Sequence, residues 1–415
     1  MHEILLDDSY KSVVEEARNL ANWVSPDLLR AMDKGEVQYP KSFVEEAGKR
    51  NLLGLRFLKE VGGRGLPFVV EMACIEEIGV LGASLGCLYS LPSIVGEAIA
   101  TFGTDDQKER FLVPTLQGKK FCAEALTEPR GGSDFFGATT RAEQKGDHFV
   151  LNGLKRFIVG AMGADYFLVY ARTGDGPKEI TAFLVERDDT VVVERVYGLL
   201  GTRGGGTGRL RFKGTRVPVE NVVLGVGRGA EVFNVMMVPE RLTPAAGAIA
   251  MGRAAIALAG RYSTRRKAFG KPIRSFQAVS FKIADAVSAL DAASSLVFAA
   301  AKACDLYGSV GAGRQDGTPV RRLVSEAKKV ATEAAWFAIN QAMQVMGGIG
   351  YTDIYPIERY LRDARLSMIW TGTNEIMNLL IQHEYYAELE RHYGKQREIE
   401  HDATTTDADD DKVFE

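Results

Sequence analysis

The 415-residue chain is 46% hydrophobic, enough to bury a large core, and its length favours two or three domains over one. A net charge of -3 and a pI near 6.1 leave no basic excess for a nucleic-acid backbone. No run reaches the roughly 18 uninterrupted apolar residues of a membrane span. We therefore expect a soluble globular protein with no nucleic-acid partner and no membrane span.

The cysteines and histidines give no indication of a metal site. The four cysteines lack CxxC spacing, and the five histidines form no HxxxH or Cys/His cluster. The start, MHEILLDDSY, is acidic, whereas a signal or transit peptide would be basic. We predict reduced thiols, a cytoplasmic location and no bound metal.

The periodicity of the sequence predicts three regions in chain order. Helical periodicity runs from about Tyr10 to Leu116. From about Phe121 to Asn234, short runs rich in Val, Phe, Tyr and Thr predict strands: HFVLNG, DYFLVYAR, ITAFLVER, VVVERV and RLRFKG. Helical periodicity returns from Gly229.

The predicted fold is therefore mainly α with a β insert. It has an N-terminal helical domain (residues 1–120), a middle β-barrel-like domain (121–234) and a C-terminal helical bundle (235–395), followed by an acidic tail (396–415) that we expect to be mobile. Strands and helices do not alternate, so a doubly wound nucleotide-binding sheet is not expected.

Two glycine-rich stretches need interpretation. The sequence from Gly225 to Ala230 matches GxGxxA, but it has no βαβ unit around it and no acidic residue about 20 positions later, so we interpret it as a tight strand-to-helix turn. The stretch GTRGGGTG, from Gly201 to Gly208, predicts a flexible loop.

A long apolar helix is predicted from Val238 to Gly270, with charged residues at both ends. Small residues at helical spacing in its middle are typical of a buried packing helix. Glu240 and Arg241 lie near its start, and Arg266 lies at its end. Each end also has an explanation without a functional site: a Glu near the N-terminus of a helix stabilises the helix dipole, and a basic C-terminal end is often solvated.

Motifs in order along the chain resemble the acyl-CoA dehydrogenase family. FCAEALTEPRGGSD (Phe121 to Asp134) resembles the family's LTEPGAGSD signature, and YSTRRKAFGKPIRSFQ, QVMGGIGY and RDARLSMIWTGTNEIM follow in family order. The resemblance covers Tyr10 to about Glu390. It implies FAD-dependent α,β-dehydrogenation of an acyl-CoA thioester to a 2-enoyl-CoA, a homotetramer, and transfer of electrons to an electron-transfer flavoprotein.

The resemblance also implies which residues contact FAD. The flavin half is expected to meet Leu126, Thr127, Ser133, Phe157, Ile158 and Val159, and the ADP half, held by a neighbouring subunit, Arg266, Phe269, Gln277, Gln344, Gly347 and Gly348, with Thr373 and Glu375 completing the set. At about 1.5 Å per residue, the 26-residue interval from Glu240 to Arg266 is about 40 Å long on one helix. We therefore expect these two residues to serve different flavins.

The catalytic base is inferred from a replacement. Many members use the Glu of a YEGT motif, but this chain has Thr371 at that position. The isovaleryl-CoA and long-chain branches place the base at the start of the long helix, immediately before an Arg, which here is Glu240. The resemblance thus implies Glu240 as base, Thr371 and Gly372 as N–H donors to the thioester oxygen, and Arg241 and Ser133 near the substrate.

Other departures from the family pattern leave alternatives open. Val159 replaces a hydroxyl residue of the family's W-I-T or W-I-S motif, so only its backbone N–H could reach flavin N5; a flavin oxidase or monooxygenase on this fold is one alternative. The missing YEGT glutamate allows another, a non-catalytic acyl-CoA-binding relative. Arg130 replaces a small residue, and we interpret it as a solvent-facing turn residue. The length, branching and aromatic character of the acyl group are not predicted.

Overall fold

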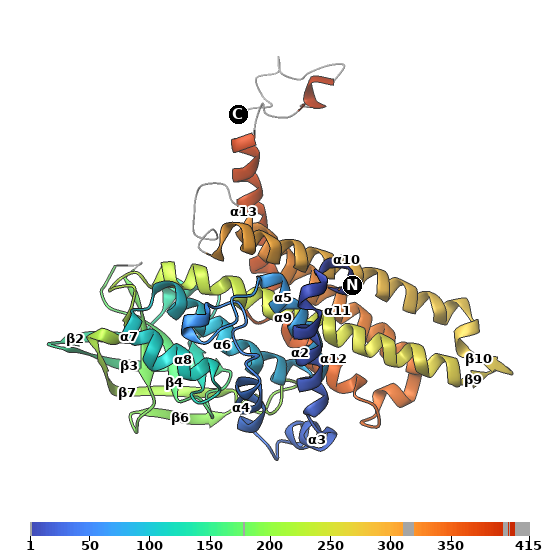
Figure 1. Cartoon of the computed structure of the whole chain (residues 1–415), viewed down its shortest axis with the longest axis horizontal. Helices are drawn as coiled ribbons and strands as arrows, with labels where there is room; N and C mark the ends of the chain where they lie inside the picture. Colours follow the sequence, from blue (N-terminus) through green and yellow to red (C-terminus); the bar gives the residue numbers. More distant parts are fainter. Residues whose placement is uncertain (1, 177–178, 310–318, 393–396, 398, 403–415) are drawn as a thin grey trace.

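A computed structural model describes residues 2–176, 179–309, 319–392, 397 and 399–402 (Figure 1). Helices come first, a sheet follows, and long helices complete the chain, which confirms the predicted architecture of helical N- and C-terminal domains around a central β-sheet domain. The acidic tail expected over residues 396–415 lies mostly outside the described residues.

The N-terminal domain consists of helices, and the ends of α3 follow local sequence signals. For example, Ser25 caps the N-terminus of α3 by accepting a hydrogen bond from the Leu28 N–H, and Gly35 ends the helix with a φ of 78°. Of these helices, α6 is the most important for the site because it forms one wall of the main cavity. The helices are α1 (His2–Leu5), α2 (Lys11–Trp23), α3 (Pro26–Lys34), α4 (Lys41–Lys49), α5 (Phe68–Ile78), α6 (Ala83–Phe102), α7 (Asp105–Gln107) and α8 (Val113–Leu116).

The central domain is an eight-stranded sheet in the order β6-β7-β3-β2-β4-β5-β8, with β1 beside β4. Its pairs are antiparallel except for β1–β4 and β2–β4. All five predicted strand runs are confirmed as β3 to β7, and β1, β2 and β8 are additional strands. The strands are β1 (Cys122–Ala125), β2 (Arg141–Lys145), β3 (His148–Ile158), β4 (Tyr166–Arg172), β5 (Ile180–Glu186), β6 (Val191–Val196), β7 (Gly208–Pro218) and β8 (Val222–Val223).

Strands β1 and β4 separate two hydrophobic cores. Because side chains alternate along a strand, successive residues enter different cores. On β4, Tyr166 and Leu168 pack into the core shared with the helices, whereas Phe167 packs into the core of the sheet domain. On β1, Cys122 belongs to the helical core and Ala123 to the sheet core. The same alternation turns the side chain of Glu124 toward the helices.

The C-terminal domain is organised around α9, a helix of 37 residues. It begins at Gly229, earlier than the predicted start at Val238, and it ends at Arg265 rather than near Gly270, because residues 267–272 form the β9–β10 hairpin. Figure 1 shows this hairpin at the end of the molecule opposite the sheet, with α13 projecting from the body. The elements are α9 (Gly229–Arg265), β9 (Lys267–Ala268), β10 (Lys271–Pro272), α10 (Gln277–Tyr307), α11 (Val320–Met346), α12 (Ile357–Ser367) and α13 (Asn374–His392).

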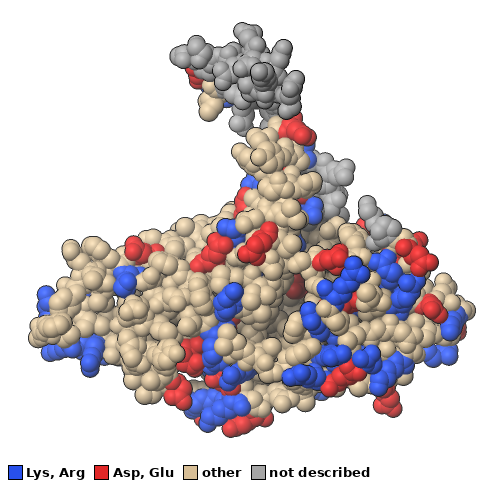
Figure 2. Space-filling model, turned by 180° about the vertical axis from the view of Figure 1, so that it is seen from behind, with Lys and Arg blue, Asp and Glu red and all other residues tan. Residues whose placement is uncertain are grey.

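Three helices, α6, α9 and α10, are long and apolar enough to cross a membrane when judged by length and composition alone. Within the fold, 78% of the apolar window of α6 and 67% of that of α9 are buried, so these two use their apolar residues for packing. Figure 2 shows that basic and acidic side chains are interspersed over the face it presents.

The glycine-rich loop from Gly201 to Gly208 is packed, and the prediction of a flexible loop is wrong. A Cβ at Gly201 would lie 2.4 Å from the backbone carbon of Arg362, a closeness that only glycine permits. The Thr202 N–H donates to Asp363 Oδ1 at 2.6 Å, and the Ala83 N–H donates to Oδ2 of the same residue at 3.0 Å. Asp363 thus ties this loop, α12 and the start of α6 together.

The stretch from Gly225 to Ala230 is the predicted turn between a strand and a helix. It joins β8 to α9, and Gly225 and Gly227 have positive φ angles of 149° and 76°. The interpretation of the GxGxxA match as a turn is confirmed.

Candidate active site

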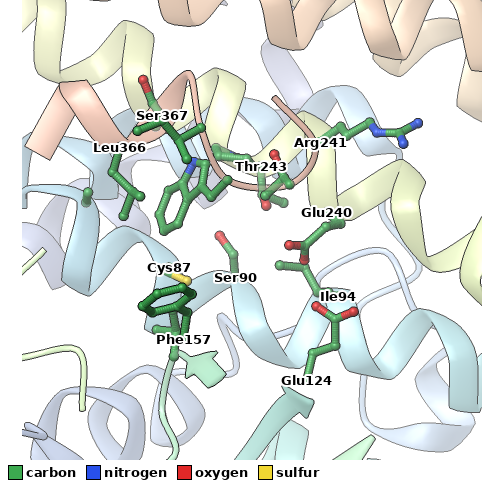
Figure 3. A pocket seen from close by; sticks show the side chains of 18 of the residues that line it. Cys87, Ser90, Ile94, Glu124, Phe157, Glu240, Arg241, Thr243, Leu366 and Ser367 are labelled. Carbon is green, nitrogen blue, oxygen red and sulfur yellow. The ribbon is translucent and has the colours of Figure 1, made fainter. Parts of the chain in front are cut away.

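A cavity of about 520 Å³ lies between the sheet domain and the helices (Figure 3). Its walls are β1 and the turn after it, the end of β3, helix α6, residues 233–251 of α9, and the segment between α12 and α13. Segments far apart in the sequence therefore meet around one space.

The cavity brings together most of the residues predicted for the flavin ring and the substrate. Those that line it are Leu126, Thr127, Ser133, Phe157, Ile158, Val159, Glu240, Arg241, Thr371, Gly372 and Thr373. Glu375 does not line it and is exposed at the start of α13. Arg130 is also exposed and away from the cavity wall.

The residues predicted for the ADP half lie elsewhere. They are exposed around the β9–β10 hairpin and at the end of α11, and Phe269 in the hairpin turn is 94% exposed: Arg266, Phe269, Gln277, Gln344, Gly347 and Gly348. None of them lines the cavity of the same chain. Their role stays a prediction.

Glu240 reaches the cavity from α9, about three turns after the helix begins. Its side chain is partly exposed, and it lines the cavity. No hydrogen bond or ion pair within the described residues engages its carboxyl oxygens. Burial, together with the nearby Glu124 carboxyl, raises the pKa of Glu240 well above its ordinary value, although Arg241 opposes the shift. This carboxyl is free to take up a proton.

Two prolines lie in the part of α9 that carries Glu240, although the helix continues past them. Pro239 precedes Glu240, and Pro244 stands four residues later. Pro244 has no N–H to donate to the Glu240 carbonyl, so the helix loses a hydrogen bond at the turn that carries the carboxyl.

Arg241 does not neutralise its neighbour. Its side chain is only 8% exposed, and in Figure 3 its guanidinium points away from Glu240. Burial and the charge of Arg321 lower the pKa of Arg241 to about 10, against the effect of Glu240. Its Nε is buried and lacks a hydrogen-bond partner among the described residues. The two adjacent side chains therefore diverge.

The segment Thr371–Gly372 faces the same cavity in an unusual backbone conformation. Both residues have positive φ angles, 56° and 86°. Lys328 on α11 holds this segment by donating to Gly372 O at 2.8 Å and to Asn374 Oδ1 at 2.9 Å. Left-handed backbone at a β-branched residue is strained, so the segment requires this external support.

The turn after β1 is anchored by a buried ion pair. Lys155 Nζ donates to Glu128 Oε1 at 2.8 Å and to Leu126 O at 2.9 Å. Burial opposes ionisation of Glu128, but the charge and hydrogen bond of Lys155 and hydrogen bonds from Thr139 outweigh it and lower the Glu128 pKa to about 2. The backbone N–H of Arg156 also donates to Thr127 O at 2.8 Å. The β1 turn and the end of β3 are thus fixed to each other.

The end of β3 presents an aromatic side chain. Phe157 has a φ of 58°, is 48% exposed, and contacts the Tyr197 ring at a centroid distance of 4.9 Å. Val159, two residues later, lines the cavity with an apolar side chain.

Sequence reasoning missed several residues of the site. Glu124, Cys87, Ser90 and Ile94 line the cavity, and Lys328 supports its loop. Glu124 had a usable signal, because a carboxylate that shares a strand face with Cys122 in an otherwise apolar strand is unusual. Lys328 had none, since it follows the pattern of an ordinary helix lysine.

The cavity fits the ring system of FAD. Beside the hydroxyl residues Thr127 and Ser133, seven buried polar atoms of cavity-lining residues have no hydrogen-bond partner among the described residues: Glu124 Oε1, Arg156 Nε, Thr207 Oγ1, Arg241 Nε, Thr243 Oγ1, Trp370 Nε1 and Thr371 Oγ1. Buried polar atoms of this kind are rarely left unpaired, so they indicate a polar ligand. A flavin ring, which carries nitrogen and oxygen atoms on a flat apolar frame, suits such a wall.

Comparison with known proteins agrees with the geometry. The chain matches the N-terminal, middle and C-terminal domains of acyl-CoA dehydrogenase over residues 7–119, 123–215 and 227–385. It is 32% identical to a 3-(aryl)acrylate reductase of Clostridium sporogenes over 90% of this chain and 97% of that protein.

Two solved structures are similar over almost the whole chain. Butyryl-CoA dehydrogenase from Megasphaera elsdenii has a TM-score of 0.86 at 31% identity, covering 92% of this chain and 99% of the other. An acyl-CoA dehydrogenase complexed with FAD from Bacillus anthracis has a TM-score of 0.87 at 26% identity, covering 94% and 68%. The chain belongs to the acyl-CoA dehydrogenase family, FAD-dependent oxidoreductases that act on acyl-CoA thioesters.

Proposed function

We propose that this enzyme converts an acyl-CoA thioester to the 2-enoyl-CoA, with Glu240 as the base that removes the α-proton. The observation that supports this role is the Glu240 carboxyl, which lines the cavity, has no partner among the described residues and has a raised pKa. Thr371, at the position of the usual family base, has a hydroxyl and cannot accept the proton in this way.

The reaction breaks two C–H bonds and forms one C=C bond. The α-hydrogen leaves as a proton to the Glu240 carboxylate, and the β-hydrogen leaves with its electron pair as a hydride. FAD, when bound, supplies the hydride acceptor at N5. A raised pKa makes Glu240 a stronger base than an exposed glutamate, which suits abstraction of a weakly acidic proton.

Thr371 and Gly372 are proposed to direct backbone N–H groups at the thioester oxygen, where negative charge develops. A donor aimed at developing charge in a site without water contributes about 3–4 kcal/mol to a transition state. The support for this assignment is that both residues line the cavity that Glu240 lines. Arg241 and Ser133 complete the proposed substrate contacts.

The proposal includes a homo-oligomer, a tetramer by resemblance to the family, and an electron-transfer flavoprotein as electron acceptor. Support for the oligomer comes from large apolar side chains left exposed on α10 and α13: Phe281, Leu306, Leu379 and Tyr386. It also comes from the residues assigned to the ADP half, which are exposed and do not line the cavity of their own chain. A cytoplasmic location remains a prediction.

The test is anaerobic reduction of the flavin in the purified holoenzyme. We expect straight, branched or aromatic acyl-CoA thioesters to bleach the flavin absorbance, and Glu240→Gln to retain FAD but to bleach at least about 1000-fold more slowly. Glu231→Gln is the matched control, because Glu231 lies on the same helix and pairs with Arg228 at the surface. Bleaching of Glu240→Gln at the parental rate would rule out this base.

A second candidate is an oxygen-using flavoenzyme, supported by Val159. Its apolar side chain lines the cavity, so it offers the flavin only a backbone N–H. Substrate-linked oxygen consumption, with peroxide or an oxygenated product, would select this alternative. A reduced flavin that reoxidises slowly in air and quickly with an electron-transfer flavoprotein would select the dehydrogenase.

A further inference from the structure

A second carboxyl group, that of Glu124, faces the cavity close to Glu240. Glu124 lies on β1, and the alternation along this strand turns it to the side of Cys122, toward the helices. In Figure 3 its carboxyl points into the cavity toward Ile94 and Glu240, while Phe157 lies on the other side of the view. Glu124 therefore belongs to the part of the cavity beside the proposed base, where an acyl chain would lie.

The Glu124 carboxyl has no partner within the described residues. Its Oε1 is buried and accepts no hydrogen bond. Lys155 attracts it electrostatically but cannot donate to it. The Lys155 ammonium already donates to Leu126 O, to Glu128 Oε1 and to Tyr170 O at 2.7 Å, and these three bonds use its three hydrogens.

The neighbouring hydroxyl groups are also engaged elsewhere. Ser90 Oγ donates to Gly86 O at 2.8 Å, and the Tyr170 hydroxyl donates to Met236 Sδ at 3.5 Å. Several of the side chains that line the cavity on α6 and α9 are apolar: Leu91, Ile94, Phe233 and Met237. In the described part of the chain, the fold itself offers Glu124 no donor.

An unpartnered carboxyl selects among acyl chains. Water can satisfy such a group in an empty cavity, but a bound acyl chain displaces that water. A purely aliphatic chain then leaves the carboxyl without a donor, which is costly in a buried site. A chain that carries its own donor restores the hydrogen bond, whereas a chain that ends in a carboxylate meets two carboxyl groups, Glu124 and Glu240.

We propose that Glu124 is a specificity-determining residue of the acyl subsite, which accepts a hydrogen bond from a hydroxyl or N–H group on the distal part of the acyl chain. The inference rests on the proposed function, because it places the acyl chain beside Glu240. It makes the preferred substrate a polar acyl-CoA with a donor, and it disfavours dicarboxylic acyl groups.

The test compares matched thioesters with the flavin-loaded enzyme. Straight-chain acyl-CoA thioesters of short and medium length are each paired with their ω-hydroxy and ω-carboxy analogues, and kcat/KM is measured for each. At the best length, we expect the parent enzyme to prefer the hydroxyacyl over the plain chain by at least about tenfold and to use the carboxyacyl chain least.

Two variants and a control separate selectivity from folding. Glu124→Leu keeps the volume but removes the acceptor, so we expect the plain chain to become the better substrate. Glu124→Gln keeps one acceptor oxygen and should retain part of the hydroxyl preference. Glu143→Leu, on the exposed face of β2, should keep the parental ratio. An unchanged ratio in Glu124→Leu, or a parent enzyme that prefers the plain chain at every length, overturns the inference.

Flavin reduction and equilibrium binding together distinguish a failure of this inference from a failure of the proposed function. If plain acyl-CoA reduces the flavin in the parent and in Glu124→Leu but the hydroxyl ratio is unchanged, only the role of Glu124 fails. If no thioester reduces the parental flavin, the proposed function fails. Binding of the same pairs to flavin-loaded Glu240→Gln still reports the selectivity, and equal affinities for hydroxyacyl and plain chains overturn the role of Glu124.

Discussion

Replacing Lys328 by methionine tests how the Thr371–Gly372 segment is held in place. Lys328 is fully buried on α11 and donates to Gly372 O and Asn374 Oδ1 at 2.8 and 2.9 Å. Methionine has a similar length and no donor. Thr371 is strained, with a φ of 56°, and we expect it to relax by turning the backbone N–H groups away from the thioester oxygen.

Two opposing terms set the effect of Lys328→Met on stability. Gly372 O loses a buried donor, which costs about 1–3 kcal/mol. Burial, assisted by the charge of Arg241, lowers the pKa of Lys328 from 10.5 to about 7, and this shift corresponds to a cost of about 5 kcal/mol for keeping the ammonium inside the protein at acidic pH. Because methionine removes that cost, the melting temperature should fall little or should rise.

The rate of the proposed reaction, unlike the stability, gains nothing from removing the buried ammonium of Lys328. A misplaced donor loop should raise the barrier by about 1.4–2.7 kcal/mol, which slows flavin reduction by about 10- to 100-fold. The assay is anaerobic stopped-flow reduction at saturating acyl-CoA, with flavin content and melting temperature measured on the same sample. Lys329→Met is the matched control, because Lys329 pairs with Glu333 on the helix surface. Parental reduction rates in Lys328→Met would refute the reasoning.

Two further predictions concern stability. Burial raises the pKa of Glu124 to about 7 from an ordinary 4.5, so the stability that its proton provides is complete below about pH 4.5 and is lost as the pH rises through about 7. Glu124→Leu should therefore stabilise the protein more at pH 8 than at pH 5, by at most about 3 kcal/mol, in denaturant unfolding; an equal change at both pH values contradicts it. Gly201→Ala should cost about 1–3 kcal/mol by pushing on α12, whereas Gly198→Ala, with no atom within 4 Å of its added Cβ, should cost little.

The fold was accessible from the sequence because periodicity reports burial directly. The helical stretches and the five strand runs each have a regular apolar pattern, and their order gave the three domains. Prediction from the sequence fails where segments that are distant in the chain pack against each other. GTRGGGTG has the composition of a flexible loop, and nothing in it shows that Gly201 packs against the backbone of Arg362. Packing of this kind depends on tertiary approach and leaves no local pattern.

Some of the cavity residues could be predicted from sequence motifs, and others could not. Leu126, Val159 and Gly372 each lie in a motif that the sequence makes recognisable, and the fold brings these motifs to one cavity. Lys328 meets Gly372 across 44 residues of chain, a contact that no motif records. Glu124 lies within a motif, but its proposed role follows from the lack of a hydrogen-bond donor among the surrounding side chains, which the sequence does not show.

Helix α9 raises a final question: whether its two ends serve one flavin or two. The 26-residue interval from Glu240 to Arg266, just past the end of this helix, spans about 40 Å at about 1.5 Å per residue, so we expect the two residues to serve different flavins. Co-expression of Glu240→Gln chains with Arg266→Ala chains tests this. If a neighbour supplies Arg266, a mixed pair has one site with both residues intact, although each variant alone is defective.

Random mixing predicts the size of the recovery. Half of the pairs are mixed and half of the sites in a mixed pair are intact, so about a quarter of the parental activity should return. If a single chain supplied both residues, every site would carry one defect, and the mixture would be no more active than the separate variants. The result therefore decides whether oligomerisation is part of the active site, since only an arrangement in which subunits exchange Arg266 can restore activity from two defective chains.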